Sequence, residues 1–344
     1  MATAFQPPTL AHPPAQASAT IPRPPAAAAE PVIRAQGLTK KFANQEAVVD
    51  LNFEIPRGII FGMIGPSGSG KTTTVRLMTG IYHPTAGSIE VMGQSPQKFS
   101  ASLRRKLGYM PQQFVLYPDL SVWENLNFSA SLYGMGFGPD RTRRIKELLA
   151  FVELDEHHHK LARNLSGGMQ RRMALAATLA HDPELLFLDE PTAGIDPILR
   201  QKFWDYFRML RSRGTTLIIT TQYVGEAANC DLVGVMAEGK LLMVESPDRL
   251  RRRAFGGEIV DLQMAKPLDF NAVAEIRRLP FVTGPVRILG DSNLRMVVDD
   301  AGTAVAALAT WAAEGQREIS SVEPVVIPLD DVFVELVKGQ SSRD

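Results

Sequence analysis

The stretch Gly65-Pro-Ser-Gly-Ser-Gly-Lys71-Thr72 combines glycines, a lysine and a hydroxyl at a fixed spacing. It fits the phosphate-loop pattern G-x-x-x-x-G-K-[ST] in full and lies between an apolar run and a segment expected to be helical. Glycines let backbone N–H groups approach phosphate oxygens, and the positive end of the following helix favours the anion. Lys71 is expected to reach the β- and γ-phosphates, and the Thr72 hydroxyl to ligate Mg²⁺. The expected nucleotide-binding residues here are Gly65, Ser67, Gly68, Ser69, Gly70, Lys71, Thr72 and Thr73.

Two carboxylates stand at the end of the run Leu185-Leu-Phe-Leu-Asp189-Glu190, whose four apolar residues predict a buried strand. Asp189 suits the Mg²⁺ side of a phosphoryl-transfer site. Glu190 points to the other side of the strand and is expected to orient or deprotonate the attacking water. An isolated acidic strand end is often only solvated, but the phosphate loop makes hydrolysis of a nucleotide the better interpretation.

A third motif, Leu165-Ser-Gly-Gly-Met-Gln-Arg-Arg172, resembles the signature of ATP-binding-cassette (ABC) ATPases. The start of the helix after Ser166 forms a second candidate anion site. In that family the signature of one subunit closes over the ATP held by the phosphate loop of the other. A chain with one copy of each motif must then dimerise to complete a site. The resemblance assigns ATP contacts to Ser166, Gly167, Gly168 and Gln170.

The same resemblance gives roles to single residues. Gln112, in GYMPQQ, matches the glutamine that senses Mg²⁺ and the attacking water, and Phe42 matches the aromatic that stacks on adenine. Asp196, in AGIDP, matches the aspartate that communicates across the dimer. The resemblance thus implies a Mg²⁺ site formed by Thr72, Gln112 and Asp189.

Gln222, in TTQY, stands where ABC cassettes usually carry a switch histidine that contacts the γ-phosphate. Its amide can donate a hydrogen bond to that phosphate but cannot carry a proton. Because Glu190 and Lys71 are retained, hydrolysis is expected to persist. The run TTQY also resembles the drug-resistance exporter branch, where glutamine is usual at this position.

From residue 32 the sequence alternates predicted strands and helices. Apolar runs predict strands at 58–65, 184–190 and 215–220. The segment 121–180 is mostly helical, with breaks at 134–139 and near Asn164. This layout predicts an α/β fold with a largely parallel central sheet. The resemblance implies an ABC cassette over 32–250, with a RecA-like sheet core, an antiparallel β subdomain and a helical subdomain.

Residues 256–340 carry a second pattern. Strand, helix, two strands, helix and strand follow in the β-α-β-β-α-β order of a ferredoxin-like α+β domain. A last helix, at 329–337, has apolar residues at helical spacing and is expected to pack on a core. Because no polar cluster resembles a catalytic set, we interpret this domain as regulatory or interacting. Its ending PLDDVFVELV resembles the "LEDVFL" ending common in cassettes of drug, polysaccharide and lipid exporters.

Composition limits the expected partners. Lys+Arg and Asp+Glu both total 37, so the charge balance does not favour nucleic acid. No apolar run approaches the roughly 20 residues that cross a bilayer. Residues 1–31 hold eight prolines and ten alanines, which predicts a disordered arm, with a tether for a partner as the alternative. The single cysteine, Cys230, is consistent with a reducing compartment.

Three further groups have two interpretations each. The aromatic residues Tyr117, Trp123 and Phe128 belong either to packing or to a surface for a membrane partner. The basic run 249–253 is interpreted as a solvated helix face rather than a lipid-headgroup site. The run 157–159 of three histidines is interpreted as surface rather than a metal site, because consecutive residues on a helix face different directions.

The sequence therefore predicts the ATP-binding and ATP-hydrolysing subunit of an ABC exporter, with ATP and Mg²⁺ as cofactors. Its expected partners are a transmembrane permease, at the cytoplasmic face of the membrane, and a second ATP-binding subunit, identical or different. One alternative is a soluble ABC ATPase acting on ribosomes or nucleic acid, which the neutral charge and the lack of a coiled coil disfavour. The other is a non-hydrolysing scaffold that binds ATP only to dimerise, for which Gln222 is the sole support.

Overall fold

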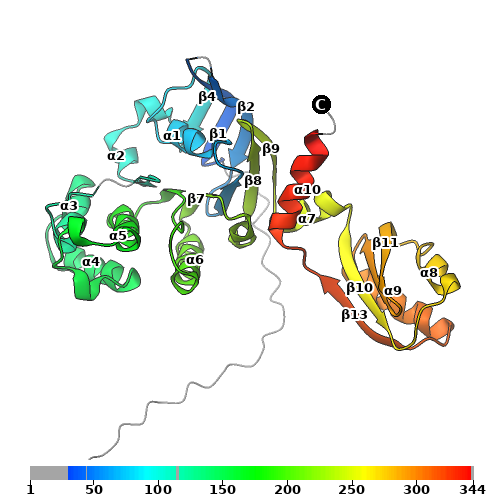
Figure 1. Cartoon of the computed structure of the whole chain (residues 1–344). Helices are drawn as coiled ribbons and strands as arrows, with labels where there is room; N and C mark the ends of the chain where they lie inside the picture. The colour runs from blue at the N-terminus through cyan, green and yellow to red at the C-terminus, as the bar shows by residue number, and fades with distance from the viewer. Residues whose placement is uncertain (1–29, 44, 114–115, 342–344) are drawn as a thin grey trace, which may run out of the picture. The chain divides into compact units, whose positions relative to one another are not determined.

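A computed structural model describes residues 30–43, 45–113 and 116–341 (Figure 1). The arm predicted over 1–31 lies outside the described residues except for its last two positions.

Three sheets organise the part of the chain that the structure describes (Figure 1). The largest has the order β5-β6-β7-β3-β8-β9. Its strands are β5 (Leu107–Met110), β6 (Leu185–Asp189), β7 (Thr216–Thr221), β3 (Ile60–Ile64), β8 (Leu232–Ala237) and β9 (Lys240–Glu245). The pairs from β5 to β8 are parallel and β9 pairs antiparallel with β8, so the predicted largely parallel sheet is confirmed.

The second sheet has the order β2-β1-β4 and is antiparallel. It consists of β1 (Ile33–Phe42), β2 (Gln45–Ile55) and β4 (Ala86–Val91). Its buried side chains share one core with α1 (Lys71–Met78) and with one face of the large sheet. This is the antiparallel subdomain that the family resemblance implied.

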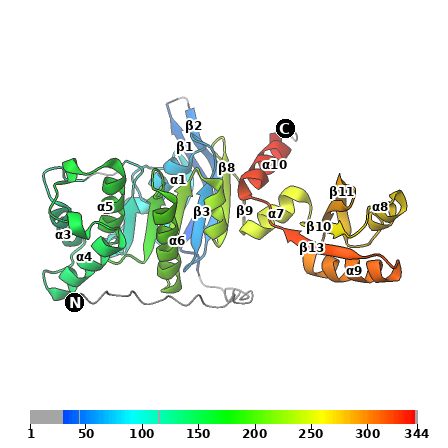
Figure 2. The same ribbon diagram turned by 60° about the horizontal axis from the view of Figure 1, so that its bottom comes forward.

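The large sheet is buried on both faces because its strands are apolar along their whole length. On β3, Ile60 and Ile64 join one core, whereas Phe61 and Met63 join the other. The first core lies beneath α3 (Val122–Leu132), α4 (Pro139–Phe151), α5 (Gly167–Leu179) and α6 (Pro197–Ser212) (Figure 2). The same alternation directs the side chains at the strand ends to opposite faces.

Local sequence signals account for the helical segment. Ser121 begins α3 with a reciprocal capping box to Glu124, and Pro139 occupies the first turn of α4 after Gly138. The breaks fall at the predicted places. Between α4 and α5 the chain forms only two 3₁₀ turns, η2 (Asp155–His157) and η3 (Ala162–Asn164). Two of the three consecutive histidines, His158 and His159, therefore lie outside any helix.

Strands β5, β8 and β9 were not predicted from the sequence. β8 contains Gly234, where a Cβ would lie 3.0 Å from the Phe61 ring, and an internal glycine weakens the strand pattern. The β8–β9 hairpin turns at Glu238 and Gly239, which have φ angles of 48° and 77°. Two successive positive φ angles are typical of the two-residue hairpin turn whose twist matches that of the strands.

The third sheet has the antiparallel order β11-β12-β10-β13. Its elements follow along the chain as β10 (Glu258–Met264), α8 (Phe270–Ile276), β11 (Val282–Gly290), β12 (Asn293–Val298), α9 (Ala301–Glu314) and β13 (Ile319–Val325). Val260, Leu294, Met296 and Leu308 belong to a separate core. The order of the elements is the β-α-β-β-α-β order expected from the sequence.

The last helix, α10 (Leu329–Ser341), packs against α7 (Pro247–Phe255) and η4 (Val224–Asn229). Leu329, Val332 and Leu336 are buried in the same core as the helices of the large sheet. The Arg251 Nε donates to the Ile327 carbonyl oxygen at 3.0 Å and fixes the approach to α10. The helix therefore packs on a core, as predicted, and that core belongs to the large sheet.

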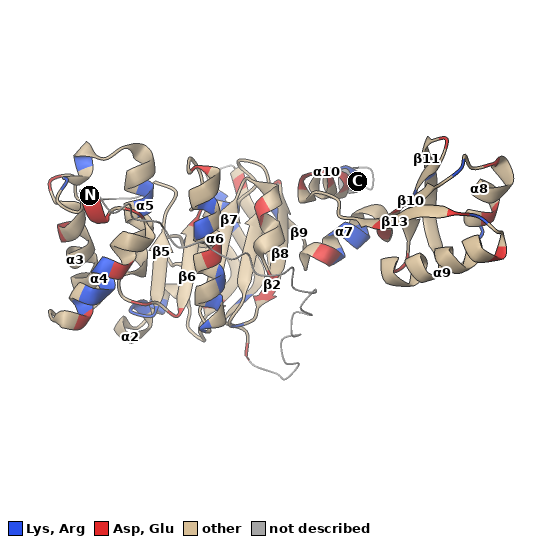
Figure 3. Cartoon of the chain, turned by 90° about the horizontal axis from the view of Figure 1, so that it is seen from below, with Lys and Arg blue, Asp and Glu red and all other residues tan. Residues whose placement is uncertain are grey.

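Lys and Arg residues are frequent on α4 and α7 (Figure 3). On α7, Arg249, Arg251 and Arg252 form ion pairs with Glu245, Asp248 and Glu258. These pairs engage most of the basic run in contacts within the chain. Among the described residues, no helix is long and apolar enough to cross a membrane. In the same residues, no group of three or more His, Cys, Asp or Glu side chains is placed to hold a metal ion.

The packing of α10 generates a stability prediction. Leu336 is 7% exposed and Val334, on the same helix, is 47% exposed. Leu336→Ala should lower the free energy of unfolding by about 2–5 kcal/mol, because it leaves a cavity among α10, α7 and η4. Val334→Ala, the matched control, should change it by less than about 0.5 kcal/mol. Urea titration of both variants measures the difference, and equal effects would contradict the docking of α10.

Candidate functional site

The loop between β3 and α1 is shaped by close backbone approaches. A Cβ at Gly65 would lie 2.2 Å from the Met236 carbonyl oxygen. A Cβ at Gly70 would lie 2.7 Å from the Ala47 carbonyl oxygen, and Gly70 has a φ of 100°. Only glycine fits these positions. The first turn of α1 contains no acidic residue of its own, and the positive end of this helix faces the loop.

Lys71 is buried beneath this loop. Its Nζ donates to the carbonyl oxygens of Gly65 at 2.6 Å and Pro66 at 2.9 Å, and lies 3.4 Å from Ser69 Oγ. Burial lowers the pKa of Lys71, and the carboxylates of Glu190 and Asp189 oppose that shift. The structure thus holds the ammonium against the carbonyl oxygens of this loop, and its expected contact with nucleotide phosphates stays a prediction.

Asp189 ends β6 on the face that carries Leu185 and Phe187, which is the face toward α1. Its Oδ1 accepts hydrogen bonds from Thr72 Oγ1, at 3.1 Å, and from Thr220 Oγ1. Its Oδ2 is buried and has no hydrogen-bond partner among the described residues. Burial raises the pKa of Asp189, and the two threonine hydroxyls oppose that shift.

These atoms fit a magnesium ion. Mg²⁺ prefers oxygen ligands and is usually bound through one or two carboxylates together with substrate phosphates. Asp189, at the end of β6, supplies that chemistry, because its buried Oδ2 has no hydrogen-bond partner among the described residues and its Oδ1 is bonded to the Thr72 hydroxyl. Thr72 and Asp189 would hold the ion. Gln112, the third expected ligand, has an amide oxygen of suitable type.

Glu190 turns away from Asp189 because its backbone is left-handed, with a φ of 53°. Such a conformation costs a non-glycine residue roughly 1–2 kcal/mol. The Glu190 N–H offsets part of this cost by donating to both the carbonyl oxygen and the Oγ1 of Thr220, each at 3.1 Å. The strained turn is what separates the two adjacent carboxylates.

The Glu190 carboxylate lies between two amides. Gln112 Nε2 donates to its Oε2 at 3.1 Å, and Gln222 Nε2 donates to its Oε1 at 2.6 Å. The structure therefore brings three predicted site residues together from separate segments. From the sequence, the Gln222 amide was assigned to the γ-phosphate; in the structure it donates to Glu190.

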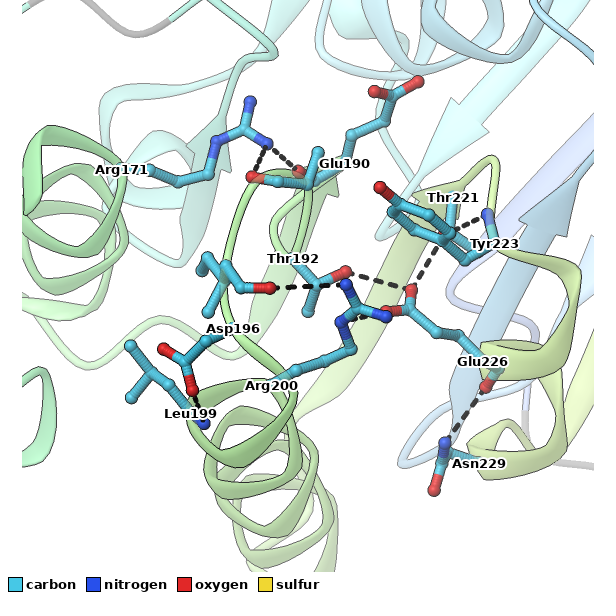
Figure 4. Close-up of polar contacts among 12 residues, drawn as sticks. Arg171, Glu190, Thr192, Asp196, Leu199, Arg200, Thr221, Tyr223, Glu226 and Asn229 are labelled. Carbon is cyan, nitrogen blue, oxygen red and sulfur yellow. Dashed lines mark hydrogen bonds and ion pairs between the residues drawn. The ribbon is translucent and has the colours of Figure 1, made fainter. Parts of the chain in front are cut away.

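Arg171 is a positioning residue that the sequence analysis missed (Figure 4). Its guanidinium donates to the carbonyl oxygens of Glu190 at 2.8 Å, Ala193 at 2.7 Å and Gln112 at 3.2 Å. Burial lowers the pKa of Arg171, against the effect of nearby Glu190 and Asp189. Arg171 belongs to the signature motif, so the sequence contained a signal for this residue. Its three hydrogen-bond partners are identified only by the fold.

The signature residues form the exposed start of α5. Ser166 Oγ accepts from the Met169 N–H at 3.3 Å, Gly167 and Gly168 lie in the first turn, and Gln170 Nε2 donates to the Ala162 carbonyl oxygen at 3.1 Å. None of these hydrogen bonds, all within the described chain, joins the signature to the phosphate loop.

Two remaining site residues are exposed. Asp196 caps α6 by accepting from the Leu199 N–H at 3.0 Å. Phe42 is 40% exposed, packs edge-on against Tyr82 at 5.1 Å between ring centroids, and lies 5.0 Å from Lys40 Nζ. An exposed aromatic ring held by a neighbouring ring has the geometry needed to stack on a base.

Known proteins share this arrangement. A family model described as ABC transporter matches residues 48–193. The probable multidrug ABC transporter ATP-binding protein YbhF of Escherichia coli (strain K12) is 39% identical over 235 residues, which are 68% of this chain and 40% of YbhF. The daunorubicin resistance ATP-binding protein DrrA3 of Streptomyces coeruleorubidus is 33% identical over 312 residues, which are 90% of this chain and 96% of DrrA3.

A solved structure shares the fold of the cassette. It is the dimeric, post-hydrolysis state of the ATP-binding cassette MJ0796 bound to ADP and Pi, with a TM-score of 0.58 and 26% identity. The match covers 62% of this chain and 98% of that one.

Asp189 gives a prediction for pH dependence. Burial raises the pKa of Asp189 in the folded protein above its value in the unfolded chain. The folded state therefore binds this proton more tightly, and the free energy of unfolding falls as the pH rises through the pKa of the folded state. Asp189→Asn should therefore raise the unfolding temperature of the nucleotide-free protein, and more at pH 8 than at pH 5. With ATP present, the variant should gain less stability from added Mg²⁺ than the wild type gains.

Thermal unfolding at the two pH values, with and without Mg²⁺ and ATP, checks both parts. Asp205→Asn, which alters a carboxylate 60% exposed on α6, serves as the control. A larger gain for Asp189→Asn at pH 5 than at pH 8 would contradict the burial argument.

Proposed function

This chain belongs to the ABC transporter family of ATPases, and from that premise we propose that it binds and hydrolyses ATP to drive a separate transmembrane permease. The observation that carries the proposal is the Glu190 carboxylate, which lies between the amides of Gln112 and Gln222 and one residue from Asp189. Because Lys71 lies in the phosphate loop beside it, the site has both a phosphate cradle and a group that can accept a proton.

Each side chain has one task in the proposed reaction. Lys71 neutralises charge on the β- and γ-phosphates, and Thr72 and Asp189 hold Mg²⁺. When bound, Mg²⁺ neutralises phosphate charge and orients the transferred group. Glu190 orients the attacking water and accepts its proton.

The two glutamines fix the position of the base. Both amides donate to Glu190, and neither can take up a proton near neutral pH. The carboxylate is therefore the proton acceptor of this trio, with its two oxygens held by donors from different segments. Such positioning, together with charge stabilisation, is the main source of rate in phosphoryl transfer.

ATP-dependent head-to-tail dimerisation is part of the proposal. Ser166, Gly167 and Asp196 are exposed in the described chain, and the signature makes no hydrogen bond to the phosphate loop. A second subunit, identical or different, would place its signature over ATP bound to Lys71. The dimeric state of the similar cassette MJ0796 supports the formation of a dimer.

Export is the proposed direction of transport. YbhF and DrrA3 are named for multidrug transport and for daunorubicin resistance. The chain spans 40% of YbhF but 96% of DrrA3, so the match to DrrA3 extends past the cassette. The protein would act at the cytoplasmic face of the membrane, bound to its permease. Neither a ribosome-linked role nor a non-hydrolysing scaffold is favoured by any contact among the described residues.

We also propose domain boundaries at 32–250 for the cassette and 256–340 for a regulatory or interaction domain. The antiparallel order β11-β12-β10-β13 and the β-α-β-β-α-β succession support a ferredoxin-like assignment for its sheet. Within this range, α10 contacts the cassette rather than the third sheet's core.

Phosphate release tests the hydrolysis proposal. Glu190→Gln should lower turnover with Mg²⁺ and ATP by about 10²–10⁴-fold, because it removes the proton acceptor. ATP binding should persist, since the phosphate loop is intact. Glu184→Gln, at the opposite end of β6, loses only an exposed ion pair with Lys106 and is the control. Wild-type turnover no higher than that of Glu190→Gln would refute hydrolysis and support the scaffold alternative.

Gln222 allows a second test. Gln222→Ala removes a hydrogen bond to a charged group, worth about 1.5–3 kcal/mol, so kcat should fall by about 10–100-fold. The Kd for ATP should stay constant if the amide acts on Glu190, and should rise if it acts on the γ-phosphate. Gln222→His should retain turnover and add a pH dependence between about pH 5 and 8. Unchanged turnover in Gln222→Ala would exclude either role.

A further inference from the structure

A second buried carboxylate, Glu226 on η4, lies close to the site and has no task in the reaction above (Figure 4). Its side chain is 6% exposed. Its Oε2 accepts hydrogen bonds from Thr192 Oγ1 at 2.9 Å and from Thr221 Oγ1 at 2.7 Å. Burying a carboxylate is costly, and the two hydroxyls on Oε2 offset part of that cost, whereas Oε1 has no hydrogen-bond partner among the described residues.

The other carboxylate oxygen faces an arginine. Arg200 Nε lies 3.5 Å from Glu226 Oε1, and the Arg200 guanidinium carbon lies 4.6 Å from the centre of the Tyr223 ring. Arg200 also donates to the Ile195 carbonyl oxygen at 3.3 Å. Figure 4 shows this guanidinium between the loop after β6 and Glu226.

These contacts join three segments that meet at the site. Thr192 follows Glu190 by two residues, Thr221 directly precedes Gln222, and Arg200 lies in the first turns of α6 after Asp196. Glu226 thus connects the loop of the proposed base with the strand end that carries its amide donor.

The last two side chains of β7 point to opposite faces of the sheet, because side chains alternate along a strand. Thr220 faces Asp189 and accepts the Glu190 N–H, whereas Thr221 faces the opposite side and donates to Glu226. The Thr221 hydroxyl also accepts the Tyr223 N–H at 3.0 Å. Gln222 therefore lies between Thr221 and Tyr223, which are joined by this hydrogen bond. Thr221 is in turn held by its hydrogen bond to Glu226.

We propose that Glu226 is a positioning residue: by holding Thr192 and Thr221 together, it fixes the Gln222 amide against the Glu190 carboxylate. This inference rests on the proposed ATP hydrolysis, because the fixed contact matters for the proposed base. Glu226 transfers no proton and touches no substrate. Its effect passes through two threonine hydroxyls to the position of one amide.

Four variants test the two hydrogen bonds and the ion pair of Glu226 individually. Glu226→Gln keeps an oxygen that can accept from both threonines but removes the charge that faces Arg200. Glu226→Ala removes both functions. Thr221→Val and Thr192→Val each remove one hydroxyl and leave Glu226 in place. Glu153→Gln, which alters an exposed carboxylate paired with Lys202 of α6, is the matched control.

Turnover and ATP affinity give the first readout. Glu226→Ala and Thr221→Val should each lower kcat by about tenfold and leave the Kd for ATP within about twofold, because the phosphate loop is untouched. Glu226→Gln should retain more turnover than Glu226→Ala, and Glu153→Gln should match the wild type. If Glu226→Ala does not fold, the two threonine variants carry the same test. Full turnover in Thr221→Val would overturn the proposal.

A double-mutant cycle distinguishes positioning from a merely structural role. If Glu226 acts through Gln222, Thr221→Val should change kcat by less than about twofold in the Gln222→Ala background. Independent losses that multiply in the double variant would overturn the proposal while leaving ATP hydrolysis established.

Hydrogen exchange of the nucleotide-free protein gives a readout that needs no hydrolysis. Backbone amides of 221–230 should exchange faster in Glu226→Ala and Thr221→Val than in the wild type, and should be unchanged in Glu153→Gln. If the wild type fails to release phosphate, the proposed function fails, and this exchange still decides the positioning claim. Equal exchange in wild type and both variants would overturn that claim by itself.

Discussion

The Oδ1 atom of Asp189 joins the segments that form the candidate site. It accepts a hydrogen bond from Thr72, at the start of α1, and another from Thr220, near the end of β7. Parallel strands place their carboxyl ends at one edge of the sheet, so a side chain at one strand end reaches both neighbouring segments. Burial of this carboxylate is costly, and its two hydroxyl partners offset part of that cost.

Two neighbouring carboxylates have different partners here because the backbone changes direction between them. Asp189 keeps the strand alternation and faces α1, whereas the left-handed Glu190 places its carboxylate against two amides. The strain at Glu190 is tolerated because its N–H donates two hydrogen bonds to Thr220 and its carbonyl oxygen accepts one from Arg171. Local strain at a functional site is thus supported by contacts from two other segments.

Contiguous motifs were sufficient to place Gly65 after β3, Lys71 at the start of α1 and Asp189 at the end of β6, because each motif needs only its own segment to be recognised. The roles of these residues toward a nucleotide stay predictions. The contact of Glu190 with Gln112 and Gln222 joins positions far apart in the chain, so no local pattern reveals it.

The missed strands and the role of Glu226 have the same physical explanation. β5 has four residues and β8 is interrupted by Gly234, so their stability comes from pairing with neighbouring strands rather than from their own pattern. Glu226 was unremarkable in sequence because its proposed role depends on which face of β7 each threonine occupies.

The packing of α10 on α7 has a mechanical consequence for the third sheet. The chain leaves the cassette through α7 and comes back to it through α10, and these two helices contact each other. Two chain segments therefore connect the sheet of β10–β13 to helices that contact each other. Two covalent connections restrict the orientations of a domain more than a single linker does. A break in the backbone at 326–328 would remove one connection without removing a residue from the sheet's core.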